Sequence, residues 1–288
     1  MATYESTDEL IQLGEIHARF RTFAAGLPDQ ERQIVAENLM WFADVRSLDD
    51  TFEGRPLFTW SDLIPTREDV MALSYRQEPF LPLFARLELV ERMLTNVRDD
   101  AERTWMMARI EEETREIYGR SSVCCFCTDP RLHRLWGQYA DNGRGYALLF
   151  DFRTPWRMEA FAGHPAIDMV PFPIVYRAGP ERPAIELSLA RNTNNPFEDV
   201  EHGLLTKSEV WRDQAEERIV RIGLASGLVP FPADSLCGVV LGYASDQFPE
   251  RRQGLIDLCR KGRSIVPVYQ ARRSMRGYEI ELHPLDGA

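Results

Sequence analysis

The sequence predicts an α+β protein in which N-terminal helices pack on a mixed or antiparallel sheet built mainly from the C-terminal half. Two observations predict this class. Apolar residues recur at three- and four-residue steps within the first part of the chain, and short runs of strand-like composition replace that pattern from residue 121 onward. We expect a single domain over residues 1–288, helix-rich over 1–120 and strand-rich over 121–288, because no linker-like segment separates the two parts.

Composition narrows the class of protein. Hydrophobic residues make up 44% and charged residues 27% of the 288 residues, which is typical of a globular protein. No apolar run approaches the ~18 residues of a membrane span. The N-terminus carries Glu5, Asp8 and Glu9 and lacks the basic start of a secretory signal, so we expect a cytoplasmic protein without a membrane partner.

The charge balance and the cysteines add two expectations. The chain has 34 basic and 45 acidic residues and a net charge of −11, which makes coating of bare nucleic acid an improbable role. The five cysteines are an odd number in a large chain, and we expect them to be reduced thiols.

Three segments have helical patterns. Residues Asp29 to Glu37 have helix-forming composition, and Asp246 to Gly262 carries apolar residues at helical spacing. The strongest periodicity runs from Leu83 to Tyr118, which predicts one long or two shorter amphipathic helices. The apolar run Leu39 to Ala43 lies in this helical third, and the turn-rich segment Arg46 to Gly54 follows it.

The second part of the chain reads as strands and loops. The segment Ala178 to Pro196 is rich in Pro, Arg and Asn and is predicted to be a loop. The predicted strands are Ser122–Thr128, Gly145–Phe152, Val170–Arg177, Arg218–Leu224, Leu236–Tyr243, Ser264–Ala271 and Gly277–Leu282.

The chain lacks the familiar catalytic signatures. It has no P-loop, no zinc-protease motif and no complete dinucleotide-binding glycine fingerprint. Cys124, Cys125 and Cys127 crowd one strand near His133, but a zinc site needs a fourth ligand at suitable spacing. Buried structural thiols are the commoner state of such cysteines, so we expect no metal.

Two aromatic residues define a first candidate site. A helical turn from Leu135 places Trp136 and Tyr139 on one face and ends in an Asx and glycine turn before Tyr146. The two rings could form a stacking wall for a planar ligand. The alternative, which is the commoner one, is that both rings are core packing under a tight turn.

A polar cluster from Lys207 to Arg218 defines a second candidate site. If a strand already starts at Gln214, then Gln214, Glu216 and Arg218 share one face. A carboxylate beside an amide could bind a ribose hydroxyl and stabilise an oxocarbenium-like centre. The alternative is a solvated helix end with an ion pair from Glu216 to Arg218.

An arginine among aromatic residues is the third feature. In Phe20-Arg21-Thr22-Phe23 the guanidinium could clamp a phosphate or carboxylate. It could equally lie over the core with its charge in water.

Taken together, these elements resemble a large uncharacterised bacterial family, domain-of-unknown-function family 2971. The resemblance spans about Glu15 to Leu282 in consistent order. The matching residues are Phe20, Arg21, Phe42, Phe52, Glu53, Trp136, Tyr139, Ala140, Asp141, Gly145, Trp211, Glu216 and Arg218. The chain departs from the family pattern at Asp49, Thr51, Cys125, Cys127 and Gln214, where Asn, Pro, Ser, Ser and Glu are usual.

The order of these motifs is similar to that of NAD-dependent ADP-ribosyltransferases, which have an early Arg or His, a middle polar strand and a late Glu. This resemblance implies that Glu216 is the catalytic residue and that NAD is the substrate. Arg21, Trp136, Tyr139 and Gln214 would bind NAD, and the acceptor would be an unknown macromolecular target, in a bacterial stress or phage response. The resemblance also leads us to expect that Glu216→Gln abolishes turnover and leaves the melting temperature nearly unchanged.

Two other functions remain open. The long amphipathic segment from Leu83 to Tyr118 suits a non-catalytic sensor or protein-interaction module. The other is a nuclease-like effector that uses Asp49, Asp50 and Glu53 to hold a divalent ion, although such carboxylates more often cap turns.

Overall fold

The computed structural model describes residues 7–23, 29–61, 64–158, 166–189, 196–261 and 265–285. The helices are α1 (Thr7–Leu13), α2 (Gln30–Val35), α3 (Arg67–Gln77), α4 (Leu83–Arg98), α5 (Asp100–Gly119), α6 (His133–Gln138), α7 (Pro196–Leu204) and α8 (Pro249–Lys261). Short 3-10 turns are η1 (Val45–Ser47), η2 (Glu209–Gln214), η3 (Ala233–Ser235) and η4 (Ser245–Gln247). The strands are β1 (His17–Arg21), β2 (Leu39–Asp44), β3 (Leu57–Trp60), β4 (Ser122–Cys127), β5 (Tyr146–Phe150), β6 (Trp156–Met158), β7 (Ile167–Met169), β8 (Phe172–Pro173), β9 (Val175–Arg177), β10 (Ala184–Leu187), β11 (Thr206–Ser208), β12 (Glu216–Arg221), β13 (Gly227–Pro230), β14 (Leu236–Leu241), β15 (Val268–Arg273) and β16 (Ile280–Pro284).

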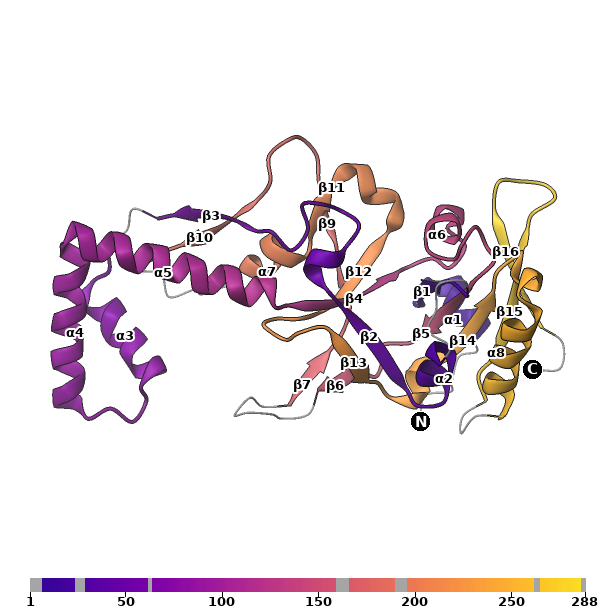
Figure 1. Ribbon diagram of the computed structural model, residues 1–288, viewed down its shortest axis with the longest axis horizontal. Coiled ribbons are helices and arrows are strands. Elements are labelled where there is room, and N and C mark those ends of the chain that lie inside the picture. Colours follow the sequence, from indigo (N-terminus) through magenta and orange to yellow (C-terminus); the bar gives the residue numbers. More distant parts are fainter. Residues whose placement is uncertain are drawn as a thin grey trace.

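A mixed sheet forms the body of the molecule and confirms the α+β class. Its strand order is β13-β2-β4-β1-β5-β14-β15-β16, and β12 pairs with β4 as an additional strand (Figure 1). The pair β14 and β15 is parallel, and the other pairs along this order are antiparallel. Most of these strands come from the C-terminal half. No helix among the described residues is both long enough and apolar enough to cross a membrane.

The sheet forks at β4. One edge of β4 pairs with β12 along its whole length, from Ser122 to Cys127. The other edge is shared, because β2 pairs only with Ser122 and Val123 and β1 pairs only with Cys127. We call the region between β1, β2 and β4 the strand fork. Arg19 bridges it, since its Nη1 donates to the Cys125 carbonyl at 2.7 Å and its Nη2 to the Trp41 carbonyl at 3.4 Å.

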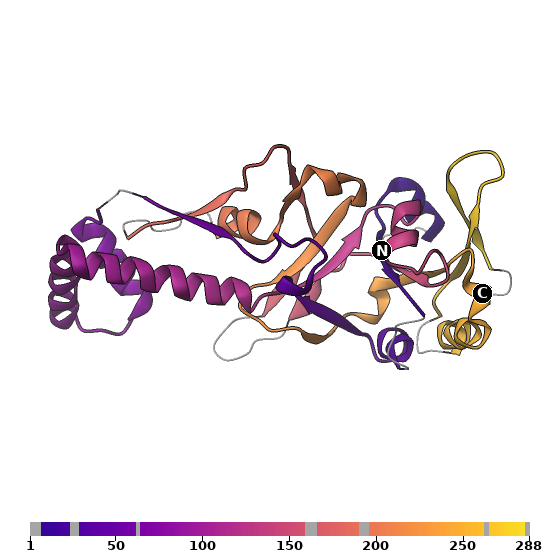
Figure 2. The same cartoon turned by 45° about the horizontal axis from the view of Figure 1, so that its top comes forward.

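Three helices leave the body as an arm. Figures 1 and 2 show α3 and α4 at one end of the molecule, away from the large sheet, and α5 running from there back to the sheet. Few of their described side chains are buried: the apolar ones are Val70 in α3, Val90 and Val97 in α4 and Tyr118 in α5, and the charged one is Arg86 in α4. Of the one long or two shorter helices predicted from Leu83 to Tyr118, the structure has two, α4 and α5. They separate at Asp99, whose carboxylate caps α5 by accepting from the Ala101 and Glu102 N–H groups at 3.0 Å.

Several boundaries differ from the sequence prediction. The apolar run from Leu39 is strand β2, and β1 also lies in the third that we expected to be mostly helical, because both segments alternate buried and open side chains. The predicted loop contains β10, which pairs in parallel with β3. The strand predicted over Val170–Arg177 is two short strands, since Pro171 and Pro173 lack the N–H of a ladder. Residues 190–195 of that loop, Gly262, Ser264 and Glu5 lie outside the described residues.

Candidate functional site

A cavity of about 220 Å³ lies at the strand fork and brings together four of the five predicted site residues. Arg21 comes from β1, Tyr139 directly follows α6, Gln214 ends η2, and Glu216 begins β12. Arg21 and Glu216 are 195 residues apart in the chain. The cavity is the place at which the sequence motifs meet.

Trp136 is the predicted site residue that does not line this cavity. Its side chain is fully buried, its indole N–H donates to the Pro130 carbonyl at 2.9 Å, and its ring packs edge-on against Phe20 at 5.0 Å. For Trp136 the structure therefore shows core packing. Of the two predicted stacking residues, Tyr139 is the one whose side chain lines this cavity.

A tight turn fixes the positions of Tyr139 and Arg21. After α6 the chain passes through Asp141, Asn142 and Gly143 with positive φ angles of 51°, 55° and 77°. At Gly145 a Cβ atom would lie 2.0 Å from the Arg21 carbonyl oxygen, so only glycine permits this approach. The sequence predicted this turn. It brings the start of β5 into close contact with the end of β1, where Tyr146 pairs with Arg21.

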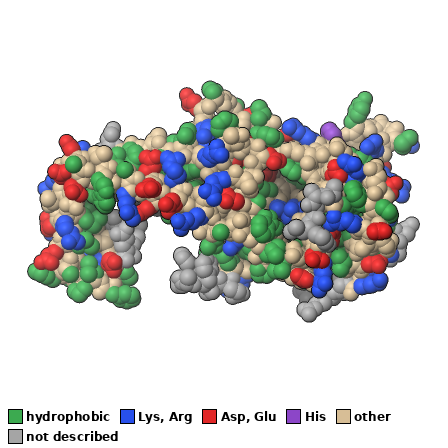
Figure 3. Space-filling model, in the orientation of Figure 1, with side chains coloured by type: hydrophobic (Ala, Val, Ile, Leu, Met, Phe, Trp, Pro, Cys, Tyr) green, Lys and Arg blue, Asp and Glu red, His purple; other side chains and the backbone are tan. Residues whose placement is uncertain are grey.

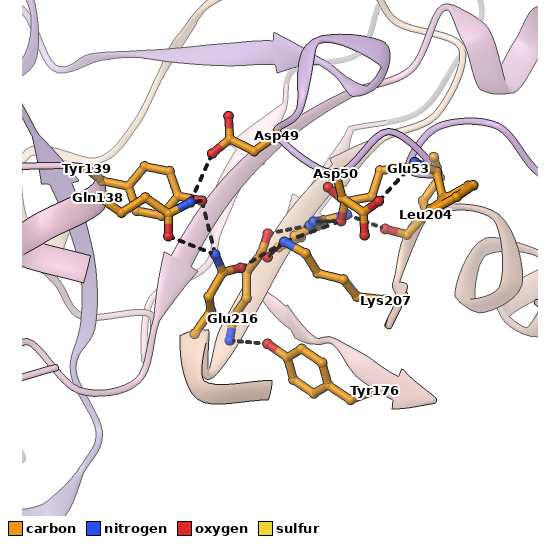
Figure 4. A network of polar contacts seen from close by, with 12 residues as sticks. Asp49, Asp50, Glu53, Gln138, Tyr139, Tyr176, Leu204, Lys207 and Glu216 are labelled. Carbon is orange, nitrogen blue, oxygen red and sulfur yellow. Dashed lines mark hydrogen bonds and ion pairs between the residues drawn. The ribbon is translucent and has the colours of Figure 1, made fainter. Parts of the chain in front are cut away.

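Four buried charged side chains form the ion-pair cluster of the site: Glu53, Lys207, Glu216 and Arg218 (Figure 4). Their side chains are at most 9% exposed. Glu216 accepts from Arg218 Nε at 2.6 Å and from Lys207 Nζ at 2.9 Å. Arg218 also contacts the Glu53 carboxylate, and Lys207 lies 3.6 Å from it.

The pKa values of the two carboxylates in this cluster are shifted in opposite directions. Burial opposes ionisation of Glu216, but Arg218 and Lys207 outweigh it and lower its pKa to about 2. Burial is the dominant effect at Glu53 and raises its pKa in spite of the same two cations. Glu216 is therefore a permanent negative charge at neutral pH rather than a proton carrier.

A polar relay links the cluster to Tyr139. Gln214 accepts from Lys207 Nζ at 2.8 Å and donates to the Tyr139 hydroxyl at 3.2 Å (Figure 4). Gln138 also donates to this hydroxyl at 3.1 Å and to Asp49 at 3.3 Å. Burial, together with the Asp49 charge, raises the pKa of Tyr139, so the phenol stays protonated.

Gln214 and Glu216 reach the same cavity by a route that the sequence did not predict. The strand starts at Glu216 and not at Gln214, because Ala215 adopts a left-handed conformation with φ 43° between η2 and β12. The solvated helix end considered from spacing is also wrong, because the ion pair from Glu216 to Arg218 exists but is buried.

The cavity also holds two arginines with no carboxylate partner among the described residues. Arg21 has one polar contact there, from Nη2 to the Met40 sulfur at 3.6 Å, and its Nε is buried without a partner. The Nε of Arg19 is likewise buried without a partner. Burial and the neighbouring Arg19 charge lower the pKa of Arg21 to about 10, which still leaves it charged at neutral pH. Two uncompensated cations favour an anionic ligand.

Among the described residues, the remaining candidate side chains form neither a metal site nor an activated nucleophile. Glu53 is held by Arg218, and Asp50 caps a turn by accepting from the Phe52 N–H at 2.9 Å. Within the described part of the chain, no group of three His, Cys, Asp or Glu side chains is placed to hold a metal ion. Cys125 and Cys127 line the cavity, but burial raises the pKa of both, to about 12 for Cys127, so the thiols are neutral.

Sequence reasoning missed Arg19, and it did not assign Glu53 or Lys207 to this site. Lys207 and Arg218 both belong to the polar segment Lys207 to Arg218, so the charged composition of that segment was the signal that could have assigned them to the site. Nothing in the sequence indicated that Glu53, 165 residues from Arg218, completes the ion pairs. Comparisons with protein-family models, with curated proteins and with solved structures find no match to this chain.

Proposed function

We propose that the cavity at the strand fork is the active site of an ADP-ribosyltransferase-like enzyme that cleaves NAD and transfers ADP-ribose to a macromolecule. One observation carries this proposal: a permanently ionised carboxylate, Glu216, lines the same cavity as Arg21, a cation without an acidic partner. Such a pair of opposite charges suits a substrate with a cationic glycosidic centre and an anionic phosphate.

The reaction needs charge stabilisation more than proton transfer. The bond from ribose C1′ to the nicotinamide nitrogen breaks, and its electron pair leaves with neutral nicotinamide. The ribose carries the positive charge as an oxocarbenium ion, near the Glu216 carboxylate. An acceptor oxygen or nitrogen then forms a bond to C1′ and releases its proton to water. Because Glu216 stays ionised well below neutral pH, it serves this step as a fixed charge.

The neighbouring side chains fit the nicotinamide half of the substrate. The Tyr139 ring offers a stacking surface, and the Gln214 amide stands beside Glu216 for a ribose hydroxyl. The cavity volume of about 220 Å³ is below the ~300–1,000 Å³ usual for small-molecule sites. It suits one end of a dinucleotide rather than the whole molecule.

Nicotinamide release from NAD tests the proposal. We expect release by the wild-type protein and its loss in Glu216→Gln, each measured at a temperature where the variant remains folded. Glu113→Gln on α5 is a matched control, because its carboxylate pairs with Arg109 on the exposed arm. Wild-type protein that neither consumes NAD nor is stabilised by it against heat would contradict the proposal.

The exposed apolar side chains of the arm support a second function, that of a protein-interaction module. The arm exposes large apolar side chains, with Phe80 96%, Phe84 74% and Trp105 61% exposed. In that case light scattering shows self-association or complex formation, and the protein binds no nucleotide. A strictly monomeric, NAD-consuming protein would exclude it.

A further inference from the structure

A second cavity, of about 280 Å³, lies next to the first and shares Arg21 with it. Its other walls are α2, β2 and β13, which contribute Gln30, Gln33, Leu39, Trp41 and Leu228. Arg19 ties the two cavities together, because it lines the first and donates to the Trp41 carbonyl beside the second.

The walls of this second cavity combine an aromatic ring with free amides. Trp41 is 45% exposed, and it lies opposite Leu228 in the pairing of β2 with β13. Gln30 and Gln33 lie one turn apart on α2 and are half-buried, and neither side-chain amide hydrogen-bonds to another described residue. An open ring face and unpaired amide donors and acceptors are what a nucleobase needs for stacking and edge recognition.

Arg21 stands where the two cavities meet, and most of its donors are unused. Its one polar contact within the described residues is the weak one to the Met40 sulfur at 3.6 Å, and its buried Nε has no partner. A guanidinium presents a planar fork of N–H groups that matches a phosphate oxygen pair.

We propose that the second cavity binds the adenine of an adenosine phosphate and that Arg21 holds the phosphates between the two cavities. This inference rests on the proposed function, which places the nicotinamide half of NAD beside Glu216. It also accounts for the size of the first cavity, because each cavity alone is below the usual range for a ligand site and the two together fall within it.

Each part of such a ligand meets a matching group. The adenine ring stacks on Trp41, and its edge, which has both a donor and an acceptor, faces the amides of Gln30 and Gln33. The phosphates neutralise Arg21 and the adjacent Arg19 charge. The ribose on the far side of the phosphates enters the first cavity.

Calorimetric titration with four probes tests the inference: AMP, ADP-ribose, nicotinamide mononucleotide and adenosine. We expect AMP and ADP-ribose to bind the wild-type protein and Trp41→Leu to weaken both by about ten-fold or more. Trp41→Phe keeps a ring and should largely restore binding. Trp105→Leu, on the exposed arm, is the matched control and should change nothing. Arg21→Gln should weaken the three phosphate-bearing probes and leave any adenosine binding unchanged.

Two results separate this inference from the proposed function. Binding of AMP that depends on Trp41, without NAD cleavage, would support an adenosine phosphate site and contradict the transferase. NAD cleavage with the same KM in wild type and Trp41→Leu would support the transferase and overturn the adenine site. Absence of AMP binding at millimolar concentration would also overturn it.

Discussion

The arm and the strand fork use the same charged residue types in opposite ways. On the arm, ion pairs such as Arg109–Glu113 and Arg115–Glu111 join successive turns of α5, and their side chains are 35–60% exposed. Figure 3 shows this arm, at the left, with charges of both signs side by side on its surface. At the fork, Glu53 and Arg218 are at most 3% exposed, and they come into contact only through tertiary folding, since they are 165 residues apart in the chain.

The difference lies in what surrounds each charge. An exposed pair exchanges water for a partner with little gain, so its contribution to stability is about 0–1 kcal/mol. A buried pair has lost its water on both sides, and removal of one partner leaves an uncompensated charge at a cost of about 3–5 kcal/mol. The exposed ion pairs of α5 are therefore replaceable, whereas the buried ion pairs at the fork hold the site in place.

The largest effect is expected for Arg218→Met. This change leaves Glu53 and Glu216 with Lys207 as their one cation in the ion-pair cluster, and we expect unfolding to become easier by about 3–5 kcal/mol in urea denaturation. The double variant Arg218→Met with Glu216→Gln should lose less than the sum of its two single changes. Strict additivity would show that the two side chains do not interact.

Acid should weaken the fork through Glu216. Its pKa is about 2 in the folded protein and about 4.5 in the unfolded chain, so its contribution is complete above the unfolded value. That contribution, about 3 kcal/mol, should be lost as the pH falls from 4.5 to 2. Glu53 has a raised pKa and contributes with the opposite sign. Denaturation midpoints against pH should show a shallower acid limb in Glu216→Gln, and an unchanged limb would contradict this assignment.

The buried ion pairs of Glu216 lead to a different expectation for the stability of Glu216→Gln than the sequence did. Because Glu216 bridges Arg218 and Lys207, its loss should lower the melting temperature as well as turnover. Stability and activity must therefore be measured separately for this variant.

A smaller effect is expected at the start of the arm. Thr66 and Asp69 form a reciprocal capping box at α3, in which the Asp69 N–H donates to Thr66 at 3.2 Å and the Thr66 N–H donates to Asp69 at 2.8 Å. Thr66→Ala should cost about 1 kcal/mol. Hydrogen exchange should show faster opening of α3 amides with protection of β4 unchanged, and slower exchange in α3 would be the opposite of this prediction.

The smallest effect is expected for Arg109→Met on α5. Its pair with Glu113 is an exposed helical (i, i+4) contact, which contributes little to stability. The urea midpoint should barely move, and high salt should reduce any remaining difference from wild type, because it screens an exposed pair. A loss as large as that of Arg218→Met would remove the distinction between the two regions.

The sequence predicted more of the fold than of the site. Short runs of strand-like composition placed β4, β5 and β14, which are buried almost throughout, and helical spacing placed α8. The same reasoning missed β1, which is five residues long and has polar side chains at its alternate positions His17, Arg19 and Arg21. It named Glu216 and Arg21, but the link from Glu53 to Arg218 joins distant turns and strands through tertiary folding, which no local pattern records.

NAD cleavage by Arg21→Gln and by Trp105→Ala, compared with wild type, tests most directly whether function lies at the fork or on the arm. Arg21 has no acidic partner among the described residues, so its replacement breaks no ion pair there. We predict nicotinamide release that is lost in Arg21→Gln and unchanged in Trp105→Ala, with both variants folded. Release that persists in Arg21→Gln, or is lost in Trp105→Ala alone, would contradict the fork as the active site.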